Sequence, residues 1–276
     1  MKELSEQTIL ITGSTDGLGK LVASHLAEEG TSVILHGRNQ EKGEMVLNEI
    51  MKSTNNNKLK YYNADLSSLE EVKTLADSIL NDYQQLDVLV NNAGIGGGPK
   101  NSSKREISKD GYELRFVVNY LSHFVLTHKL LELIKKSSPA RIVNVSSIGQ
   151  EPIDFEDVMT EINYDSLKAY RRSKLAQIMF TFDLAEELRK DKVTVNCLHP
   201  ATLMNTNMVY EFFGKTMSTV EDGAKALEHL ITSEQLENVT GEYFNGMKKS
   251  RANDQAYDLE VRKKLRELSL RWLPIK

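Results

Sequence analysis

"TILITGSTDGLG", residues 8–19, joins a short apolar run to three closely spaced glycines. The β-branched run predicts a buried strand, and a segment of helical period follows directly at 18–30. In that setting Gly13 would allow a tight turn, Gly17 would let the backbone approach a phosphate, and Gly19 would allow close helix packing. The free N–H groups of the helix N-terminus would face the anion. The stretch therefore predicts a nucleotide-binding strand–loop–helix unit, with an ordinary glycine-rich turn as the alternative.

The rest of the chain repeats this alternation of apolar runs and helical segments. Strands are expected at 8–12, 32–36, 58–65, 86–92, 141–147, 192–200 and in "GEYFN" at 241–245. Helices are expected at 18–30, 40–52, 68–83, 110–136, 167–190, 219–233 and about 254–272. Such alternation is typical of an α/β fold with a parallel sheet covered on both faces. We predict a doubly wound parallel sheet of about seven strands in a single domain, residues 1–276.

Composition excludes several classes of partner. Hydrophobic residues make up 40% and charged residues 27% of the chain, and the formal charge is −4 without a basic cluster, so no nucleic-acid footprint is expected. No apolar run approaches the roughly 20 residues that span a bilayer, so no membrane anchor is expected. The only cysteine, Cys197, lies in an apolar run and is interpreted as a packed core thiol in a cytoplasmic protein. No metal site is predicted.

Five further motifs stand in order along the chain. They are "NADL" at 63–66, "NNAG" at 91–94, "VNYLSHF" at 118–124, "IVNVSS" at 142–147 and "YRRSK" at 170–174. With the TGxxxGxG loop, they resemble the short-chain dehydrogenase/reductase family and its Rossmann-type fold. The long interval 148–169 resembles the retinol-dehydrogenase-like branch of that family. The resemblance implies hydride transfer between a nicotinamide cofactor and a carbonyl or alcohol, with catalytic residues Asn119, Ser147, Tyr170 and Lys174.

The same resemblance implies where a dinucleotide would bind. The expected contacts are Gly13, Ser14, Thr15, Asp16, Gly17, Leu18, Gly19, Arg38, Asn39, Asp65, Leu66, Asn92, Ala93, Gly94, Tyr170, Lys174, Pro200 and Thr202. The second strand ends in "LHGRN", with Arg38 where an NAD site usually carries a carboxylate. An arginine binds a 2′-phosphate that a carboxylate would repel. We therefore predict that NADP(H) is preferred over NAD(H), with a solvated loop arginine as the alternative.

The spacing YxxxK occurs twice, as Tyr164 with Lys168 and Tyr170 with Lys174. Chance supplies about one such pair in a chain of this composition, so at least one is accidental. Asn163 and Asp165 are good N-caps, which places Tyr164 in or before the first helical turn. The family pattern YxxSK matches only the second pair. We predict that Tyr170 is catalytic, with its pKa lowered by Lys174, and that Tyr164 is a packing or surface aromatic.

The segment "HPATLMNTNMVYEFF", 199–213, departs from the family pattern, because Ala201 stands where a glycine is usual. The threonine that would contact the cofactor carboxamide is Thr202 or Thr206. A substrate lid is expected at about 201–218, with Met204, Met208, Val209, Tyr210, Phe212 and Phe213 as its apolar side chains. A hydrophobic substrate and a helix packed on the core both fit this composition.

The function predicted is therefore that of an NADPH-dependent carbonyl reductase or alcohol dehydrogenase. Two alternatives remain open: a non-catalytic NADP(H)-binding sensor, and a reductase of C=C or C=N bonds on the same scaffold. The resemblance also implies a homodimer or homotetramer formed through the two long helices, 110–136 and 167–190.

Overall fold

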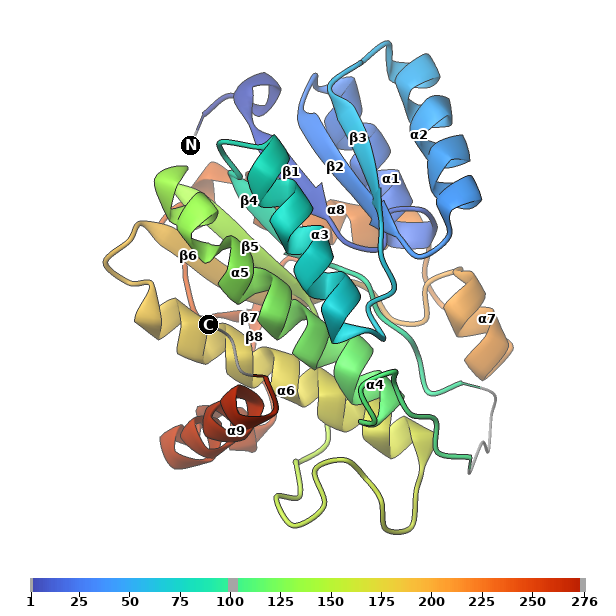
Figure 1. Cartoon of the computed structure of the whole chain (residues 1–276), viewed down its shortest axis with the longest axis vertical. Helices are drawn as coiled ribbons and strands as arrows, with labels where there is room; N and C mark the ends of the chain where they lie inside the picture. The colour runs from blue at the N-terminus through green and yellow to red at the C-terminus, as the bar shows by residue number, and fades with distance from the viewer. Residues whose placement is uncertain (1, 99–103, 274–276) are drawn as a thin grey trace.

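The computed structural model describes residues 2–98 and 104–273, with the side chain of Phe212 left out. One eight-stranded sheet runs through the molecule in the order β3-β2-β1-β4-β5-β6-β7-β8 (Figure 1). The strands are β1 Thr8–Ile11, β2 Ser32–Gly37, β3 Leu59–Asn63, β4 Val88–Asn91, β5 Ala140–Val145, β6 Val193–His199, β7 Tyr243–Asn245 and β8 Lys248–Ser250. Each neighbouring pair from β3 to β7 is parallel, which confirms the predicted doubly wound sheet.

The eighth strand was not predicted. β8 pairs antiparallel with β7, and all three of its residues are exposed. Such a short, polar edge strand has no alternation of buried and exposed side chains, so its sequence carries no strand signal. It lies at the far edge of the sheet from the glycine loop.

Helices cover the two faces of the sheet in separate groups. One apolar cluster unites α1 Gly17–Glu28, α2 Gln40–Thr54 and α8 Val220–Thr232 with one face, and a larger one unites α3 Leu69–Asp82, α5 Ser122–Lys136 and α6 Ser166–Glu187 with the other. The remaining elements are α4 Leu114–Phe116, α7 Asn207–Phe213, α9 Leu259–Trp272, a π-helical turn at Val117–Leu121, and 3₁₀ turns at Leu4–Glu6, Glu234–Leu236 and Asp254–Tyr257. Both faces are buried, as the continuous apolar strands require.

The segment expected to be one long helix at 110–136 has a different form. It begins at Leu114 and contains the π-helical turn Val117–Leu121 before α5. A π turn leaves no mark in apolar periodicity because it adds a single residue to an otherwise helical run. It places Asn119 inside the irregular turn.

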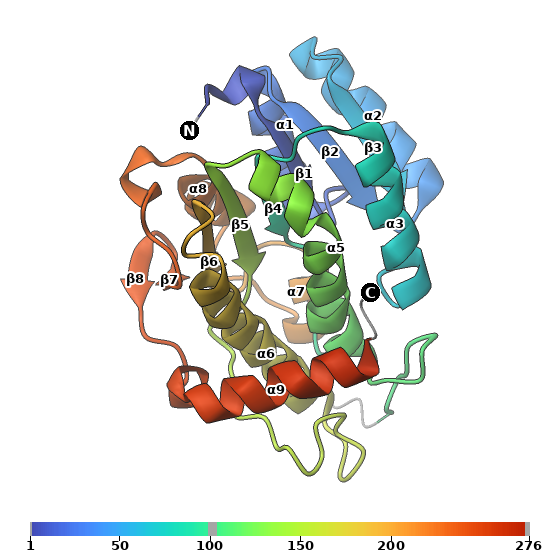
Figure 2. The same cartoon turned by 60° about the vertical axis from the view of Figure 1, so that its left-hand side comes forward.

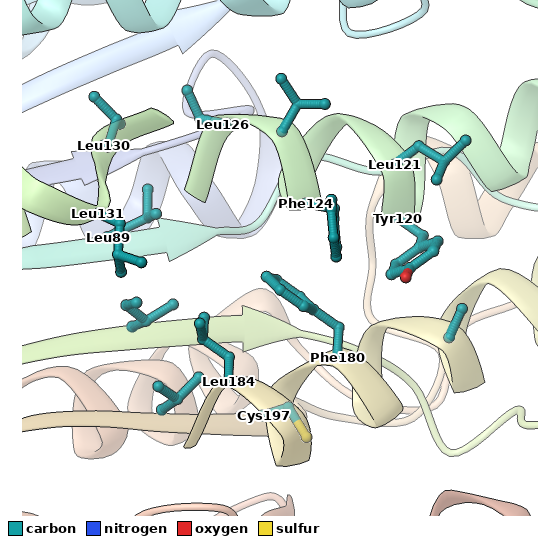
Figure 3. Packing of buried hydrophobic residues seen from close by; sticks show 14 of the residues in the cluster. Leu89, Tyr120, Leu121, Phe124, Leu126, Leu130, Leu131, Phe180, Leu184 and Cys197 are labelled. Carbon is teal, nitrogen blue, oxygen red and sulfur yellow. The ribbon is translucent and has the colours of Figure 1, made fainter. Parts of the chain in front are cut away.

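The larger cluster includes an aromatic seam between α5 and α6 (Figure 3). The Phe124 and Phe180 rings have centroids 5.1 Å apart, and Tyr120 lies edge-on to both. Cys197 lies in the same cluster, fully buried, and burial raises the pKa of its thiol to about 12. This confirms the interpretation of Cys197 as a core thiol.

Helix α9 lies across α6, and its C-terminal end comes near the beginning of α5 (Figure 2). The two long helices were predicted to form a surface for self-association. In the structure, the chain's own C-terminal helix covers part of that surface.

Candidate active site

The glycine loop joins β1 to α1 at the carboxyl end of the sheet, between β2 and β4. Gly13 has φ +65°, and a Cβ there would lie 2.8 Å from the Cα of Ala93. A Cβ on Gly19 would lie 2.4 Å from the Gly13 carbonyl oxygen. Neither position accepts a side chain, because the neighbours in both cases are backbone atoms. The loop therefore packs against the residues after β4 at the point where the strand order reverses, which is where ligands bind in such sheets.

Hydrogen bonds hold the loop to the β4 end. The Thr12 hydroxyl accepts from the backbone N–H groups of Asn92 and Ala93, both at 2.9 Å. The Asn92 amide donates to the carbonyl oxygens of Thr12 and Gly13, at 2.8 and 3.2 Å. Asn92 was predicted as a cofactor contact, and its side chain here shapes the loop that would meet the cofactor.

Ser14 is tied to the end of β2 through His36, which the sequence analysis did not single out. The Ser14 hydroxyl accepts from the His36 backbone N–H at 2.9 Å, and the His36 ring accepts from Gly13 N–H at 3.2 Å. The other ring nitrogen lies 3.1 Å from the Ala64 carbonyl oxygen. Burial lowers the pKa of His36 to about 4, so the ring is neutral and can accept at one nitrogen and donate at the other. Its only sequence signal is a polar residue in an apolar strand.

Arg38 follows β2 on the exposed surface. Within the described ranges its guanidinium makes no hydrogen bond or ion pair. Asn39 beside it caps α2 by accepting from the Lys42 N–H at 2.8 Å. An exposed arginine with free donors at this strand end can receive an anionic ligand group.

Asp65 and Leu66 follow β3. Burial opposes ionisation of Asp65, but the hydrogen bonds from Ser67 and the charge of Lys109 outweigh it, so the pKa of Asp65 is lowered. Asp65 Oδ1 accepts from Ser67 N–H at 3.0 Å, whereas the Leu66 side chain is buried in the core. Asp65 thus presents a carboxylate just after the end of β3, and the buried side chain of Leu66 holds this segment in place by packing.

Asp16 starts α1 as its N-cap, where its carboxylate accepts from Gly17 N–H at 2.8 Å. It also pairs with Lys42 at 2.5 Å, and these bonds lower the pKa of Asp16. The side chain of Leu18 is buried, and Thr15 lies against Gly37. These residues therefore shape the glycine loop, and Lys42 offsets the negative charge of Asp16 beside it.

The structure brings the four predicted catalytic residues together at the carboxyl ends of the strands. Ser147 follows β5, and its hydroxyl accepts from Gly149 N–H at 3.0 Å. Tyr170 and Lys174 lie one turn apart on α6. A Cβ on Gly94, after β4, would lie 3.1 Å from Asn119 Oδ1 and 3.5 Å from Lys174 Nζ. These groups therefore converge where β4 and β5 end.

Asn119 links this edge to α6 through the π turn. Its Oδ1 accepts from the Ile95 N–H at 2.8 Å, and its amide donates to the Ile95 carbonyl at 3.1 Å. The same amide donates to Ser173 Oγ at 2.9 Å, and Ser173 donates to the Tyr170 carbonyl at 2.7 Å. Asn119 therefore holds the β4 loop and the tyrosine-bearing helix in one fixed relation.

Burial dominates the protonation of the Tyr–Lys pair. It raises the pKa of the Tyr170 phenol, and a hydrogen bond with Ser147 acts in the opposite direction. It also lowers the pKa of Lys174 to about 7. The Lys174 ammonium donates to the Val145 carbonyl at 2.8 Å and to Gln177 at 3.3 Å. The prediction that Lys174 lowers the pKa of Tyr170 was wrong for this arrangement: burial raises that pKa, and the Lys174 ammonium is engaged with the Val145 carbonyl.

A buried chain of polar groups behind the site was missed from sequence. His123 lies one turn after Asn119, and its ring nitrogens lie 3.4 Å from Thr12 Oγ1 and 3.3 Å from Gln177 Nε2. Gln177 in turn accepts from Lys174. Polar residues on a mostly apolar helix face are the only signal. These side chains connect the glycine loop to Lys174 through neutral groups, since burial lowers the pKa of His123 to about 3.

Tyr164 takes part in a buried ion-pair network, so its description as a packing or surface aromatic was incomplete. Its hydroxyl donates to Glu113 at 3.0 Å and accepts from Arg115 at 2.7 Å. The Glu113 and Arg115 side chains are only 1% and 2% exposed. Arg115 also donates to the carbonyl oxygens of Gly96 and Gly97, at 3.1 and 3.2 Å. Tyr164 therefore helps to hold the loop after β4, and its hydroxyl is occupied by charged partners.

The segment after β6 lies over the glycine loop. Pro200 is buried, and the hydroxyl of Thr202 lies 3.1 Å from His199 Nε2. Thr206 is the N-cap of α7, and a Cβ on Gly17 would lie 3.2 Å from its methyl group. Of the two threonines considered, Thr206 thus contacts the glycine loop, whereas Thr202 is engaged with His199.

Helix α7 closes the site on the side of the β4 loop. Asn207 donates to Asp16 at 3.3 Å, and a Cβ on Gly96 would lie 3.2 Å from Met208 Cγ. Met208, Tyr210, Phe213 and the following Met217 are 41–71% exposed. The Phe212 side chain, which was also predicted for the lid, is not among the described parts of the structure. Within the described residues, no helix meets the length and hydropathy of a membrane span, and no group of three or more His, Cys, Asp or Glu is placed to hold a metal.

Comparison with known proteins extends the resemblance. The short chain dehydrogenase family model matches residues 7–216. Mouse retinol dehydrogenase 13 is 36% identical over 94% of this chain and 81% of its own length. Human retinol dehydrogenase 11 is 35% identical over 99% and 88%.

Among solved structures, a protein from Mycobacterium paratuberculosis superposes with a TM-score of 0.79 at 26% identity, covering 100% of this chain and 96% of its own. A short chain dehydrogenase from Shigella flexneri complexed with NADP superposes with a TM-score of 0.72 at 27% identity, covering 90% and 100%.

Titration of Lys174 should make the free energy of unfolding depend on pH. The pKa of Lys174 falls from about 10.5 in the unfolded chain to about 7 in the folded protein. Between these values the unfolded chain binds more protons, so the contribution of Lys174 to the free energy of unfolding rises with pH. In urea unfolding, the free energy of unfolding of wild type should therefore increase relative to that of Lys174→Met as the pH rises from 7 towards 10. A constant difference across this window would contradict the buried, weakly basic lysine.

Removing the Tyr164 hydroxyl should destabilise the protein. Tyr164→Phe leaves Glu113 and Arg115 with one hydrogen bond fewer each, and a bond to a charged group contributes about 1.5–3 kcal/mol. We expect a loss of that order in the free energy of unfolding. Tyr210→Phe is the control, because the Tyr210 hydroxyl is exposed and makes no hydrogen bond within the described residues. Equal stabilities of the two variants would refute the role of the network.

Proposed function

The chain belongs to the short-chain dehydrogenase/reductase family, on its retinol-dehydrogenase-like branch, and from this premise we propose that it is an NADPH-dependent reductase of hydrophobic carbonyl compounds, or the reverse dehydrogenase. As a family member it is an oxidoreductase of alcohol or carbonyl groups. The observation that carries the finer proposal is the convergence of Ser147, Tyr170, Lys174 and Asn119 beside the glycine loop.

The glycine loop and the strand ends beside it suit a dinucleotide. The glycine loop leaves no room for side chains at Gly13 and Gly19, so a ligand phosphate could come close to the backbone at the start of α1. Gly13, Gly17 and Asn92 would hold the pyrophosphate end, Asp65 the adenine, and Lys174 the nicotinamide ribose. Bound NADPH would supply the hydride, and the protein's own task is to handle the proton and the oxygen.

Tyr170 is proposed as the proton donor to the substrate oxygen. Burial raises the pKa of the phenol, so Tyr170 carries its proton near neutral pH and would release it as charge develops on the substrate oxygen. Ser147 would hydrogen-bond the same oxygen and stabilise the charge that develops on it. Asn119, fixed between Ile95 and Ser173, would keep Tyr170 at the correct position. A proton taken from Tyr170 would be replaced from the Lys174 ammonium, which burial makes more acidic.

Preference for NADPH rests on Arg38. The residues after β2 provide an exposed guanidinium and no carboxylate, which favours a 2′-phosphate over a free ribose hydroxyl. The NADP in the Shigella flexneri structure supports this direction. A Brucella melitensis relative of the same fold is complexed with NADH, so the fold alone does not choose.

A hydrophobic substrate is supported by the lid. Met208 packs near Gly96, and the adjoining side chains of Tyr210 and Phe213 are roughly half exposed. Apolar side chains around a few fixed polar groups are usual for a small-molecule site. The alternative of a non-catalytic NADP(H) sensor is disfavoured by the intact four-residue set. Reduction of C=C or C=N bonds would use the same residues and is distinguished by its products.

Replacing the proposed acid should abolish turnover while the cofactor still binds. Tyr170→Phe should lower kcat by about 10²–10⁴-fold, the usual contribution of a positioned acid. NADPH oxidation with a panel of aldehydes and ketones measures this, and NADPH fluorescence titration measures the Kd, which should stay close to wild type. Tyr164→Phe, the matched control, should retain most of kcat.

Three outcomes of that experiment differ in meaning. A large loss of kcat in Tyr164→Phe with little loss in Tyr170→Phe would reverse the assignment. Tight NADPH binding without turnover by wild type on a broad panel would favour the sensor. Reduced C=C or C=N products would move the activity to the third class.

Charge reversal at Arg38 should reverse cofactor preference. Arg38→Asp removes a charged hydrogen bond to the 2′-phosphate and adds repulsion, so the ratio of Kd for NADP⁺ to Kd for NAD⁺ should rise at least about tenfold. Arg189→Asp, an exposed arginine beyond α6, is the control for net charge. An unchanged ratio in Arg38→Asp would remove the basis for NADPH preference.

A further inference from the structure

We propose that Tyr243 and Gln150 are positioning residues for Ser147, and that the segment 253–255, just before α9, holds Gln150 and the chain after it in place. The inference rests on the proposed function, in which the Ser147 hydroxyl bonds the substrate oxygen. It deepens that function by naming the side chains that fix this hydroxyl.

The backbone carbonyl of Ser147 accepts two side-chain hydrogen bonds. The Tyr243 hydroxyl donates to it at 3.2 Å, and the Gln150 amide donates to it at 3.0 Å. A carbonyl oxygen has two lone pairs, so these two donors fill it. Rotation of the Ser147 peptide would therefore break at least one of the two bonds.

Tyr243 brings its hydroxyl to Ser147 from the sheet itself. It lies on β7, opposite Cys197 of β6, and only 2% of its surface is exposed. Burial raises the pKa of Tyr243, so the hydroxyl keeps its proton and remains a donor. A donor on a paired strand is held more precisely than one on a loop.

Gln150 uses both ends of its amide. The nitrogen donates to Ser147, and Oε1 accepts from the Asn253 backbone N–H at 2.7 Å. Asn253 is itself the N-cap of the 3₁₀ turn Asp254–Tyr257, where its side chain accepts from the Gln255 N–H. Gln150 therefore links the peptide of Ser147 to the backbone of the C-terminal segment.

Gln255 provides a second link to the same loop. Its Oε1 accepts from the Ile153 N–H at 2.7 Å, and its Nε2 donates to the Ile153 carbonyl at 3.0 Å. The chain reaches this turn from β8, at the edge of the sheet, and the turn lies against α6 (Figure 2). The segment after Ser147 is thus held at two points by one stretch of the C-terminal chain.

Fixing the carbonyl of Ser147 also fixes its hydroxyl. The hydroxyl accepts from the Gly149 N–H at 3.0 Å and shares a hydrogen bond with Tyr170. A Cβ on Gly149 would lie 3.4 Å from Ser147 Oγ and 3.9 Å from Tyr170 Cε1, so both groups face the same point. A group that stabilises a developing charge acts best when it is already in place. A rotated Ser147 peptide would turn the hydroxyl away from the substrate oxygen.

A double-mutant cycle on kcat tests whether Tyr243 acts through Ser147. Tyr243→Phe should lower the kcat of wild type by about three- to tenfold, because one of the two bonds on the carbonyl is lost. In Ser147→Ala the same substitution should change kcat by less than about 1.5-fold, because no hydroxyl remains to be positioned. An equal loss in both backgrounds would show a merely structural role and overturn the proposal.

Tyr120→Phe is the matched control. The Tyr120 hydroxyl is buried to the same degree, at 1% exposure, but its partner is Ser269 of α9 at 2.8 Å. Its kcat should stay near that of wild type. Gln150→Met repeats the cycle at a half-buried position, which covers the case in which Tyr243→Phe does not fold.

Hydrogen exchange of the Gly149 N–H tests the positioning without turnover, since this group donates to the Ser147 hydroxyl. Measured by NMR on the full chain, it should quicken at least severalfold in Tyr243→Phe and stay near wild type in Tyr120→Phe. Equal exchange in the two variants would refute the positioning role. Failure of the proposed function would appear differently, as wild type that reduces no carbonyl compound of the panel.

Gln255→Leu tests the contribution of the C-terminal segment. The variant loses both bonds to Ile153, so exchange should quicken at the Ile153 N–H and also at the Gly149 N–H. A change confined to Ile153 would show that the C-terminal segment does not hold Ser147.

Discussion

The contact of Gly13 with Ala93 is the constraint on which the site depends. A side chain at Gly13 would lie 2.8 Å from the Ala93 backbone, so β1 and β4 can end side by side only with glycine there. Thr12 and Asn92 then join the two strand ends by hydrogen bonds. The chain leaves these strands towards opposite faces of the sheet, and the resulting crevice is where a dinucleotide can lie.

The π turn connects this loop to α6, the helix that carries Tyr170 and Lys174. Because it holds an extra residue per turn, it directs Asn119 at once to Ile95 on the β4 loop and to Ser173 on α6. One turn earlier, Arg115 holds the carbonyl oxygens of Gly96 and Gly97. Two side chains of one helical segment thus determine the shape of the loop that the substrate would meet, and Tyr164 is a part of that support.

Much of this could be predicted from the sequence, for identifiable reasons. Continuous apolar strands, glycines between a strand and a helix, and motifs in a fixed order determined the sheet and the regions of the site. Interactions between distant residues could not be predicted in the same way. The partners of His36, Tyr164 and Gln177 are set by tertiary packing, and a polar residue in an apolar strand or helix does not reveal which partner it will meet. The prediction of a lowered Tyr170 pKa was wrong for the same reason, because this pKa depends on burial, which residue spacing does not reveal.

Burial also links Lys174, on the inner side of α6, to the C-terminal helix α9 on its outer side. The pKa of Lys174 falls to about 7 only because α6 is packed closely against β5. On its outer side α6 carries acidic residues that are partly buried, and burial raises the pKa of Asp183 against the pull of Arg262. Helix α9 supplies the arginines that make this outer side stable. A helix whose inner side holds a desolvated lysine gains rigidity from a cover on its outer side, and here the same chain provides both.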